Sequence, residues 1–288
     1  MNEKKEQWTV GSILKWTAQY FCEKGVESPR LDAEVLLSHI LGKDRLYLYV
    51  YFDRPLDEQE LTKYRQLVKL RAQRTPVAYL TGHKEFMGLR FTVTPEVLIP
   101  RPDTEVLVEA AMERLREKTK PSILDIGTGS GAIIISLLAN LPQACGLGID
   151  LSAPALAVTG HNAVAHQVSD RLELLTGDVF GPLSHHRFDA IVSNPPYIPD
   201  KDIAGLSPEV HHEPHGALAG GQDGLNFYRR IISEAPGYVN SGGFVALEVG
   251  INQAEAVAAL ARDGGVFAVE AVIKDYGGIA RVLVLRAP

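Results

Sequence analysis

The sequence predicts an α/β protein with a seven-stranded, mostly parallel sheet that ends in an antiparallel hairpin, preceded by a small N-terminal helical domain. Three observations support this prediction. Only helical patterns fill the region from residue 11 to residue 74. From residue 122 onward, short apolar runs alternate with helical patterns. The last two runs are separated only by a short turn at 275–278, which cannot hold a crossover helix and therefore indicates antiparallel strands.

Three helical patterns make up the N-terminal domain. The first is expected to have Ser12 as its cap and to end before Gly25. The second has Pro29 in its first turn, where the missing N–H costs nothing. The predicted helices span residues 11–24, 29–41 and 57–74.

A short hairpin is expected to follow these helices. It runs from Glu85 to Thr94 and has Gly88 at its centre. The predicted domains are a helical domain at 1–84, a hairpin linker at 85–98 and an α/β domain at 99–288. No internal repeat interrupts this organisation.

Seven apolar runs are expected to form the sheet, because each has the length and the flanking turn residues of a buried strand. The predicted strands cover residues 122–126, 146–150, 172–175, 188–193, 244–249, 266–273 and 282–285. Two of the alternating helices are expected at 132–138 and 251–262.

The composition is that of a globular protein without a membrane segment. Apolar residues make up 45% of the chain and the mean hydropathy is −0.01. No apolar stretch reaches the roughly 18 residues of a membrane span. Residues 1–6 are polar and of mixed charge, so no secretory signal is expected. The two cysteines, Cys22 and Cys145, cannot form a disulfide framework or a metal cluster, which favours the cytoplasm.

A glycine-rich loop follows the first predicted strand and opens a helix. Gly127, Gly129 and Gly131 let the backbone turn sharply and approach a ligand closely. The order of strand, glycine loop and helix is typical of a nucleotide-type site. The spacing is G-x-G-x-G, whereas dinucleotide loops usually have G-x-G-x-x-G, so NAD is disfavoured.

Acidic residues occur at three successive strand ends. Asp125 leads into the glycine loop, and Asp150 ends the second strand about twenty residues later, where it could accept hydrogen bonds from both hydroxyls of a ribose. Asp178 follows the third strand. A single acid at such a position is usually a helix cap or a turn residue, but three in this order favour a nucleoside ligand.

The segment Asn194-Pro195-Pro196-Tyr197 follows the fourth strand. Its two prolines cannot continue a sheet ladder and keep the backbone extended beyond the carboxyl end of the strand, where α/β sheets bind ligands. Amide and carbonyl oxygens here could accept both N–H bonds of a planar NH2 group while Tyr197 stacks on its plane.

The glycine loop and the acids resemble those of class I S-adenosylmethionine-dependent methyltransferases. The whole chain, from about residue 10 to its C-terminus, resembles the HemK/PrmC family of protein-(glutamine-N5) methyltransferases, which modify the glutamine of the GGQ motif in peptide chain release factors. The matching segments are 74–82, 99–105, 127–131, 194–197, Glu213-Pro214 before Ala217-Leu218, 220–225, 248–250 and Arg281-Val282.

This resemblance implies a Rossmann-like methyltransferase domain, a helical domain that recognises the substrate, and a monomeric cytoplasmic enzyme. It implies S-adenosylmethionine as cofactor, with S-adenosylhomocysteine as product, and release factors as partners. The cofactor-binding residues would be Asp125, Gly127, Thr128, Gly129, Ser130, Gly131, Asp150, Asp178, Val179 and Asn194. The substrate would be bound by Asn194, Pro195, Pro196 and Tyr197, with Asn194, Pro195 and Tyr197 as the catalytic residues.

The chemistry of the acceptor indicates the mechanism. An amide nitrogen is a poor nucleophile, because its lone pair is shared with the carbonyl. The side-chain oxygen of Asn194 and the carbonyl of Pro195 could accept its two hydrogens and orient it for in-line transfer. These contacts strengthen as positive charge develops on the nitrogen, so they favour the transition state. No general base is needed if the proton leaves after methyl transfer.

Three other functions remain open. A glutamine methyltransferase of a ribosomal protein would share the motif and the chemistry. An adenine-N6 nucleic-acid methyltransferase would also share the Asn194–Tyr197 motif. Residues 1–90 carry a net charge of +3 and the remainder −9, however, which disfavours nucleic acid as the direct methyl acceptor. A non-catalytic cofactor-binding module is expected to lack a motif residue, yet all are present.

Two further clusters of side chains lie outside these motifs. His211, His212 and His215 lie where the family commonly has an aromatic residue, and their spacing fits no usual metal site, so no metal is expected. The third predicted helix carries a basic stretch, which is interpreted as a solvated face, with a dock for an acidic partner as the alternative. The basic residues are Lys63, Arg65, Lys69, Arg71 and Arg74.

Overall fold

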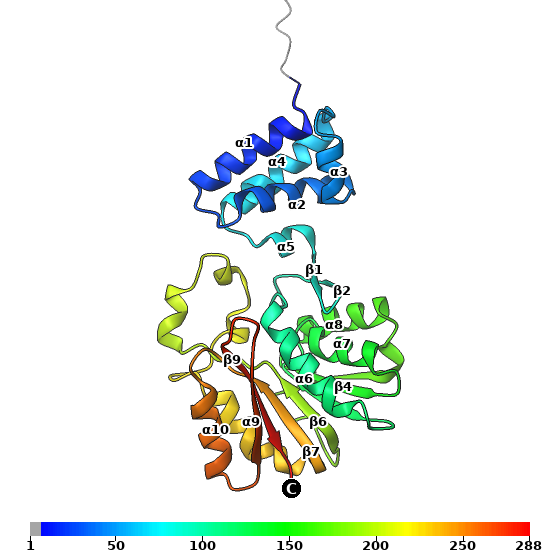
Figure 1. Ribbon diagram of the computed structural model, residues 1–288, viewed down its shortest axis with the longest axis vertical. Coiled ribbons are helices and arrows are strands. Elements are labelled where there is room, and N and C mark those ends of the chain that lie inside the picture. Colours follow the sequence, from blue (N-terminus) through cyan, green and yellow to red (C-terminus); the bar gives the residue numbers. More distant parts are fainter. Residues whose placement is uncertain (1–6) are drawn as a thin grey trace, which may run out of the picture. The chain divides into compact units, whose positions relative to one another are not determined.

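The computed structural model describes residues 7–288 and consists of two compact units (Figure 1). The first unit contains the described residues up to Gly82 together with Ser207–His212. The second contains His83–Leu206 and Glu213–Pro288. Residues 1–6, in which no secretory signal is expected, lie outside the described residues.

The first unit is helical. Its helices are α1 (Val10–Glu23), α2 (Pro29–Leu41), α3 (Arg45–Val50), α4 (Glu58–Ala72) and α5 (Val77–Thr81). Helix α1 is capped by Thr9, so the prediction of Ser12 as its cap is wrong. The Thr9 side chain accepts a hydrogen bond from the Ser12 backbone, and the Ser12 hydroxyl accepts one from the Thr9 backbone over 2.9 Å. Ser12 is therefore the third residue of a capping box that begins at Thr9.

Helices α3 and α5 were not predicted. They have 6 and 5 residues, which is too short to show a helical period in the sequence. Asp44 caps α3 by accepting a hydrogen bond from the backbone of Tyr47 over 2.8 Å.

The helical unit contains a buried carboxylate that joins α2 to α3. Glu34 is 1% exposed and accepts hydrogen bonds from Arg30 over 2.6 Å, Arg45 over 2.7 Å and the Tyr49 hydroxyl over 2.6 Å. Burial acts to raise the pKa of Glu34, but the hydrogen bonds from Tyr49, Arg45 and Arg30 outweigh it and hold this pKa below its usual value.

The second unit contains a sheet with the strand order β5-β4-β3-β6-β7-β9-β8. Strand β9 pairs antiparallel with β7 and β8, whereas the remaining pairs are parallel, so the predicted sheet is confirmed. The strands are β3 (Ser122–Ile126), β4 (Cys145–Asp150), β5 (Leu172–Thr176), β6 (Phe188–Ser193), β7 (Val239–Glu248), β8 (Ala268–Lys274) and β9 (Ala280–Arg286). Strand β7 begins five residues before its prediction, because Gly242 and Gly243 interrupt the apolar pattern there.

Helices cover both faces of this sheet (Figure 1). One core contains residues of α6 (Glu105–Leu115), α7 (Ala132–Asn140) and α8 (Ala153–Ala165), and the other contains residues of α9 (Asn226–Glu234) and α10 (Ala254–Asp263). Neighbouring strand residues alternate between the two cores; for example, Ile123 belongs to the first and Leu124 to the second. Short 3-10 helices lie at Pro102–Thr104, Ser169–Arg171, Asp200–Gly205, Val210–His212, His215–Ala217 and Ala235–Gly237.

The predicted hairpin is formed by β1 (His83–Phe86) and β2 (Leu89–Thr92). Its turn has Met87 and Gly88 with φ of 50° and 71°. Phe86 and Phe91 pack into the core beside α6 and α7, so the hairpin is part of the second unit.

None of the helices within residues 7–288 has the length and apolar character that crossing a membrane requires.

Replacing Glu34 with Gln is expected to lower the free energy of unfolding by about 1–3 kcal/mol at pH 7, because two arginines lose their charged acceptor. The folded-state pKa is depressed, so this contribution is present above the usual glutamate pKa of 4.5 and is lost as the pH falls below it. Urea unfolding of both proteins at pH 7 and pH 3.5 checks this. An equal difference at the two pH values would contradict it.

Candidate active site

A cavity of about 490 Å³ lies at the carboxyl ends of the parallel strands in the second unit. Its volume is within the range of about 300–1,000 Å³ that small-molecule sites usually have. Eight of the predicted site residues line it: Gly127, Gly129, Asp150, Asp178, Val179, Asn194, Pro195 and Pro196. These eight residues lie at the carboxyl ends of four different strands, β3, β4, β5 and β6.

The glycine loop between β3 and α7 forms one wall. Gly127, Gly129 and Gly131 all have left-handed backbones, with φ of 73°, 56° and 80°. The Asp150 carboxylate accepts hydrogen bonds from the backbone N–H groups of Gly129 and Ser152, each over 2.9 Å. Asp150 therefore joins the loops that follow β3 and β4, and its remaining lone pairs are available to a ligand.

Asp125 lies behind the glycine loop and does not line the cavity. Its side chain is fully buried and accepts a hydrogen bond from the Thr128 hydroxyl over 2.8 Å, while Oδ1 has no hydrogen-bond partner among the described residues. Burial raises the pKa of Asp125 to about 7, and the charge of Asp150 acts in the same direction. Thr128, Ser130 and Gly131 are also absent from the cavity lining. Asp125, Thr128, Ser130 and Gly131 therefore belong to the strand end and the glycine loop without facing the cavity.

Asp178 and Val179 form the wall that follows β5. Both oxygens of Asp178 accept hydrogen bonds from Arg230 on α9 over 3.0 Å. Val179 is buried and has a left-handed φ of 53°, which is an uncommon conformation for a β-branched residue. Such strain is concentrated at functional sites.

The segment after β6 forms the remaining wall. Asn194, Pro195 and Pro196 line the cavity, and the Asn194 side-chain nitrogen donates a hydrogen bond to the Thr104 hydroxyl over 3.2 Å. Tyr197 is not a lining residue. Its ring lies beside Gly250, where an added Cβ would lie 2.9 Å from Tyr197 Cδ2. Burial raises the pKa of Tyr197 to about 12.

Several lining residues were not predicted as site residues. They are Glu96, Val97, Leu98, Ile126, Ile149, Leu151, Ser152, Ala155, Gly177, Ser193, Pro214, Gly216, Ala217 and Phe227. Glu213, which precedes the lining residue Pro214, is buried. Its carboxylate accepts hydrogen bonds from the backbone of Ile99 over 3.2 Å and from the Arg101 side chain. The sequence signal was present, because 99–105 and Glu213-Pro214 are both family segments, but nothing in the sequence indicated that they meet.

The histidine cluster forms no metal site. Within residues 7–288, no group of three or more His, Cys, Asp or Glu side chains could hold a metal ion. His211 and His212 belong to the helical unit and His215 to the sheet unit.

Comparison with known protein families identifies both parts of the chain. Residues 12–82 match the PrmC N-terminal domain, and residues 103–209 match the methyltransferase small domain. A release factor glutamine methyltransferase of Geobacter sulfurreducens is 49% identical over 98% of both chains. The chain belongs to the release factor glutamine methyltransferase family. The family's enzyme of Moorella thermoacetica is 46% identical over 94% of this chain and 95% of its own.

Solved structures agree with the fold of this family member. The hMettl16 catalytic domain, solved in complex with a MAT2A 3'UTR hairpin, has a TM-score of 0.56 at 17% identity and covers 81% of this chain and 84% of its own. A methyltransferase from Pyrococcus furiosus has a TM-score of 0.51 at 18% identity, over 77% of this chain and 97% of its own. At these identities the similarity shows the Rossmann-like fold alone.

The cavity fits the cofactor of this methyltransferase family, S-adenosylmethionine. The cofactor carries an ammonium group, and the buried carboxyl group of Asp125 lies behind the glycine loop that lines the cavity, with one oxygen that has no hydrogen-bond partner within the described residues. It also carries a ribose and an adenine, and Asp150, Asp178 and the apolar Val179 line the cavity. These carboxylates and the apolar Val179 therefore suit a nucleoside that carries a positively charged group.

Replacing Gly131 with Ala is expected to destabilise the protein by about 2 kcal/mol or more and to weaken binding of S-adenosylmethionine. An added Cβ would lie 2.6 Å from Ile135 Cδ1 and 2.7 Å from Thr159 Cγ2, on a backbone with a φ of 80°. Thermal unfolding and calorimetric titration measure both effects. Gly237→Ala is the control, because a Cβ there meets open space. Equal melting temperatures and affinities for the two variants would contradict this account.

Proposed function

We propose that the protein transfers a methyl group from S-adenosylmethionine to the side-chain amide N5 of the glutamine in the GGQ motif of peptide chain release factors. The observation that carries the proposal is the placement of Asn194 and Pro195 at the cavity of a chain that matches named release factor glutamine methyltransferases over nearly its full length. When bound, the cofactor supplies an electrophilic methyl group.

The residues after β6 would position the acceptor amide. Asn194 donates its side-chain N–H to Thr104, so its amide oxygen is the atom left to accept a hydrogen bond from the substrate. The Pro195 carbonyl would accept the other amide hydrogen, and Pro196 would contact the side chain through its ring. The hydrogen bonds to both acceptors would strengthen as positive charge develops on the nitrogen of the substrate amide. The stacking role of Tyr197 remains a prediction from the sequence.

Asp150 and Asp178 would hold the nucleoside end of the cofactor, with Gly127 and Gly129 against its amino-acid end. Asp125, Thr128, Ser130 and Gly131 would act from behind the loop through charge and shape. The unpartnered oxygen of Asp125 supports this role.

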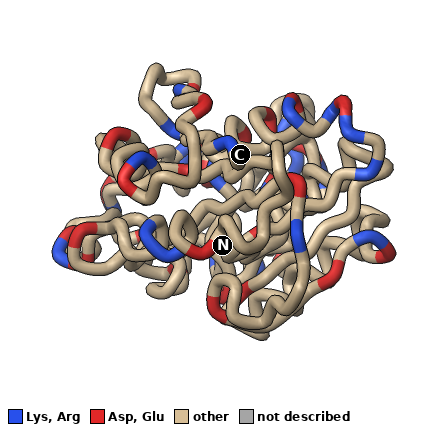
Figure 2. The backbone as a smooth tube through the Cα atoms, turned by 90° about the horizontal axis from the view of Figure 1, so that it is seen from below, with Lys and Arg blue, Asp and Glu red and all other residues tan. Residues whose placement is uncertain are grey.

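A nucleic acid is a less suitable methyl acceptor for this chain. The net charge of residues 91–288 is −9, and in Figure 2 acidic and basic segments are interspersed along the backbone. A nucleic-acid surface would require an extended basic patch.

The helical unit would recognise the release factor. Part of its basic stretch is paired within the unit. Arg71 is 5% exposed and pairs with Asp32 and Glu209, and Arg74 also pairs with Glu209. The interpretation of the whole stretch as a solvated face is therefore wrong for Arg71. Arg65 and Lys69 form no salt bridge within the described residues and are free for another role.

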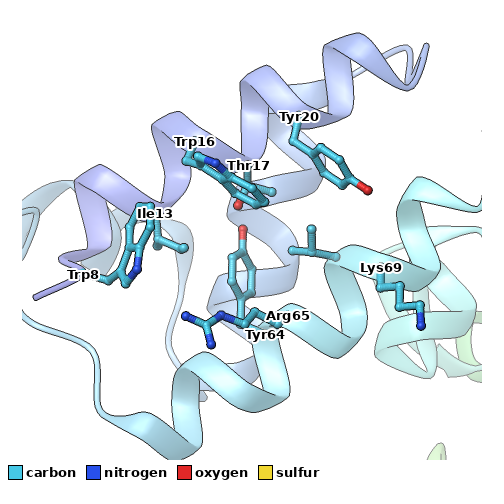
Figure 3. Close-up of a pocket in the computed structure, with 9 residues that line it drawn as sticks. Trp8, Ile13, Trp16, Thr17, Tyr20, Tyr64, Arg65 and Lys69 are labelled. Carbon is cyan, nitrogen blue, oxygen red and sulfur yellow. The ribbon is translucent and has the colours of Figure 1, made fainter. Parts of the chain in front are cut away.

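Arg65 and Lys69 line an aromatic cleft of about 340 Å³ between α1 and α4 (Figure 3). Trp16 is 47% exposed and stacks on Tyr20, with ring centroids 5.2 Å apart. Thr17 and Tyr64 lie at the base of the cleft and are both fully buried. Exposed aromatic rings beside two cations favour an acidic segment of the release factor that carries an apolar side chain.

The enzyme would work in the cytoplasm as a monomer. Cys22 and Cys145 are exposed and form no disulfide, which is usual in a reducing compartment.

The proposed function is tested by incubating the protein with labelled S-adenosylmethionine and an unmethylated release factor, with a factor whose GGQ glutamine is changed to alanine as the control. We expect label on the native factor alone, located on that glutamine by peptide mass spectrometry.

Asn194→Ala should reduce transfer by at least about 10²-fold, because an acceptor for the developing charge is lost. It should still bind the cofactor. Turnover near that of the wild type would contradict the role of Asn194.

Replacing Lys69 with Glu should raise the KM for the release factor at least about fivefold, because charge attraction to an acidic segment becomes repulsion. The kcat and the affinity for S-adenosylmethionine should stay near their wild-type values. Steady-state kinetics with varied release factor measure this. Lys63→Glu is the matched control, since Lys63 is exposed on the same helix but does not line the cleft. An equal effect of both variants would show only a general charge effect.

A further inference from the structure

The side chain of Asn194 has a buried polar environment on the side away from the cavity. Its nitrogen donates a hydrogen bond to Thr104 Oγ1 over 3.2 Å, and Thr104 is 4% exposed. The neighbouring strand supplies a second group, because Ser193 of β6 pairs in register with Leu247 of β7, and Glu248 follows Leu247. Glu248 is 1% exposed.

One carboxylate oxygen of Glu248, Oε2, is buried without a hydrogen-bond partner within the described residues. Burial raises the pKa of Glu248 to about 7, whereas hydrogen bonding to Thr104, the charge of Arg281 and hydrogen bonding to Asn194 lower it. Thr104, which accepts the Asn194 side-chain N–H, and Asn194 itself are thus both among the groups that stabilise the ionised carboxylate.

The orientation of the Asn194 amide decides whether it can bind the substrate. The two ends of an asparagine amide have nearly the same shape, but one accepts hydrogen bonds and the other donates them. The Thr104 hydroxyl can do either, so it cannot select the orientation alone. An ionised carboxylate can only accept, and next to Asn194 it therefore selects the side-chain nitrogen.

We propose that Glu248 is a positioning residue that, together with Thr104, holds the Asn194 amide with its nitrogen toward β7 and its oxygen toward the substrate amide. This inference rests on the proposed function, in which the oxygen of Asn194 accepts an N–H of the glutamine. Glu248 itself does not line the cavity.

Replacing Glu248 with Gln tests this role without changing the shape of the side chain. A glutamine can donate to Thr104 or to the Asn194 oxygen, so the flipped amide becomes accessible. We expect kcat to fall about 10²-fold, the size of effect seen when one positioned hydrogen bond to a developing charge is lost. The affinity for S-adenosylmethionine should change by less than about twofold, because no cofactor contact is altered.

Stability separates this role from a merely structural one. Folding raises the pKa of Glu248 from its usual value of 4.5 to about 7, so burying the ionised form costs stability increasingly above pH 4.5. A neutral glutamine avoids that cost. At pH 8 the variant should therefore melt at or above the wild-type temperature while turning over more slowly. A structural residue would lower both together.

Two further variants complete the experiment. Thr104→Ser keeps the hydroxyl and should retain wild-type kcat within about threefold, whereas Thr104→Val should lose activity as Glu248→Gln does. Asp189→Asn is the matched control, because this carboxylate lies at the opposite end of β6 and accepts hydrogen bonds from Lys118 and the Ser122 backbone, over 2.7 and 2.9 Å. It should lower the melting temperature without lowering kcat.

Single-turnover methylation of the native release factor by the full-length proteins gives the result. A Glu248→Gln rate within threefold of wild type would overturn the proposal, as would a loss that follows the melting temperature or the cofactor affinity. Failure of the proposed function itself is distinguishable, because the wild-type protein would then also leave the release factor unlabelled.

Discussion

In a parallel sheet every strand ends at the same edge, and in this protein four neighbouring strands end there with chemically useful groups. Strand β3 leads into the glycine loop, β4 ends in Asp150, β5 is followed by Asp178, and β6 by Asn194. The pairing of these strands therefore brings together groups that are up to about seventy residues apart in the sequence. The cavity exists because of this register, and the helices on the two faces hold the register in place.

A second level of organisation lies behind the cavity wall. Residues of the segment before α6 meet residues of later loops and strands: Ile99 and Arg101 bind Glu213, and Thr104 binds Asn194. The Arg281 guanidinium lies 3.0 Å from Asp103 and 3.1 Å from Asp275. Glu213 and Arg281 are buried, and buried charges are costly unless paired, so these contacts fix the positions of both side chains. The residues that face the ligand owe their geometry to these contacts.

The sequence was sufficient for the sheet, its antiparallel end, the longer N-terminal helices and eight residues of the cavity, because each has a local signal: an apolar run, a glycine spacing or a proline pair. It was not sufficient for contacts between remote segments. Nothing in the sequence shows that Asp125 lies behind the cavity wall, or that Asp178 is shared with Arg230. The short helix α3 was missed because six residues show no measurable period. The capping residue Thr9 was missed because Ser12, three residues later in the same capping box, is an equally suitable cap by residue type.

The chain contributes two separate segments to the helical unit. Ser207–His212 belongs to the helical unit, where Glu209 pairs with Arg71 and Arg74, yet the residues just after this segment return to the wall of the cofactor cavity. A fragment that begins after Gly82 would keep Glu209 but lose both of its arginines. The catalytic unit is therefore not a module that can be excised by a single cut, and fusion or domain-exchange experiments on this enzyme need to carry both segments of the helical unit together.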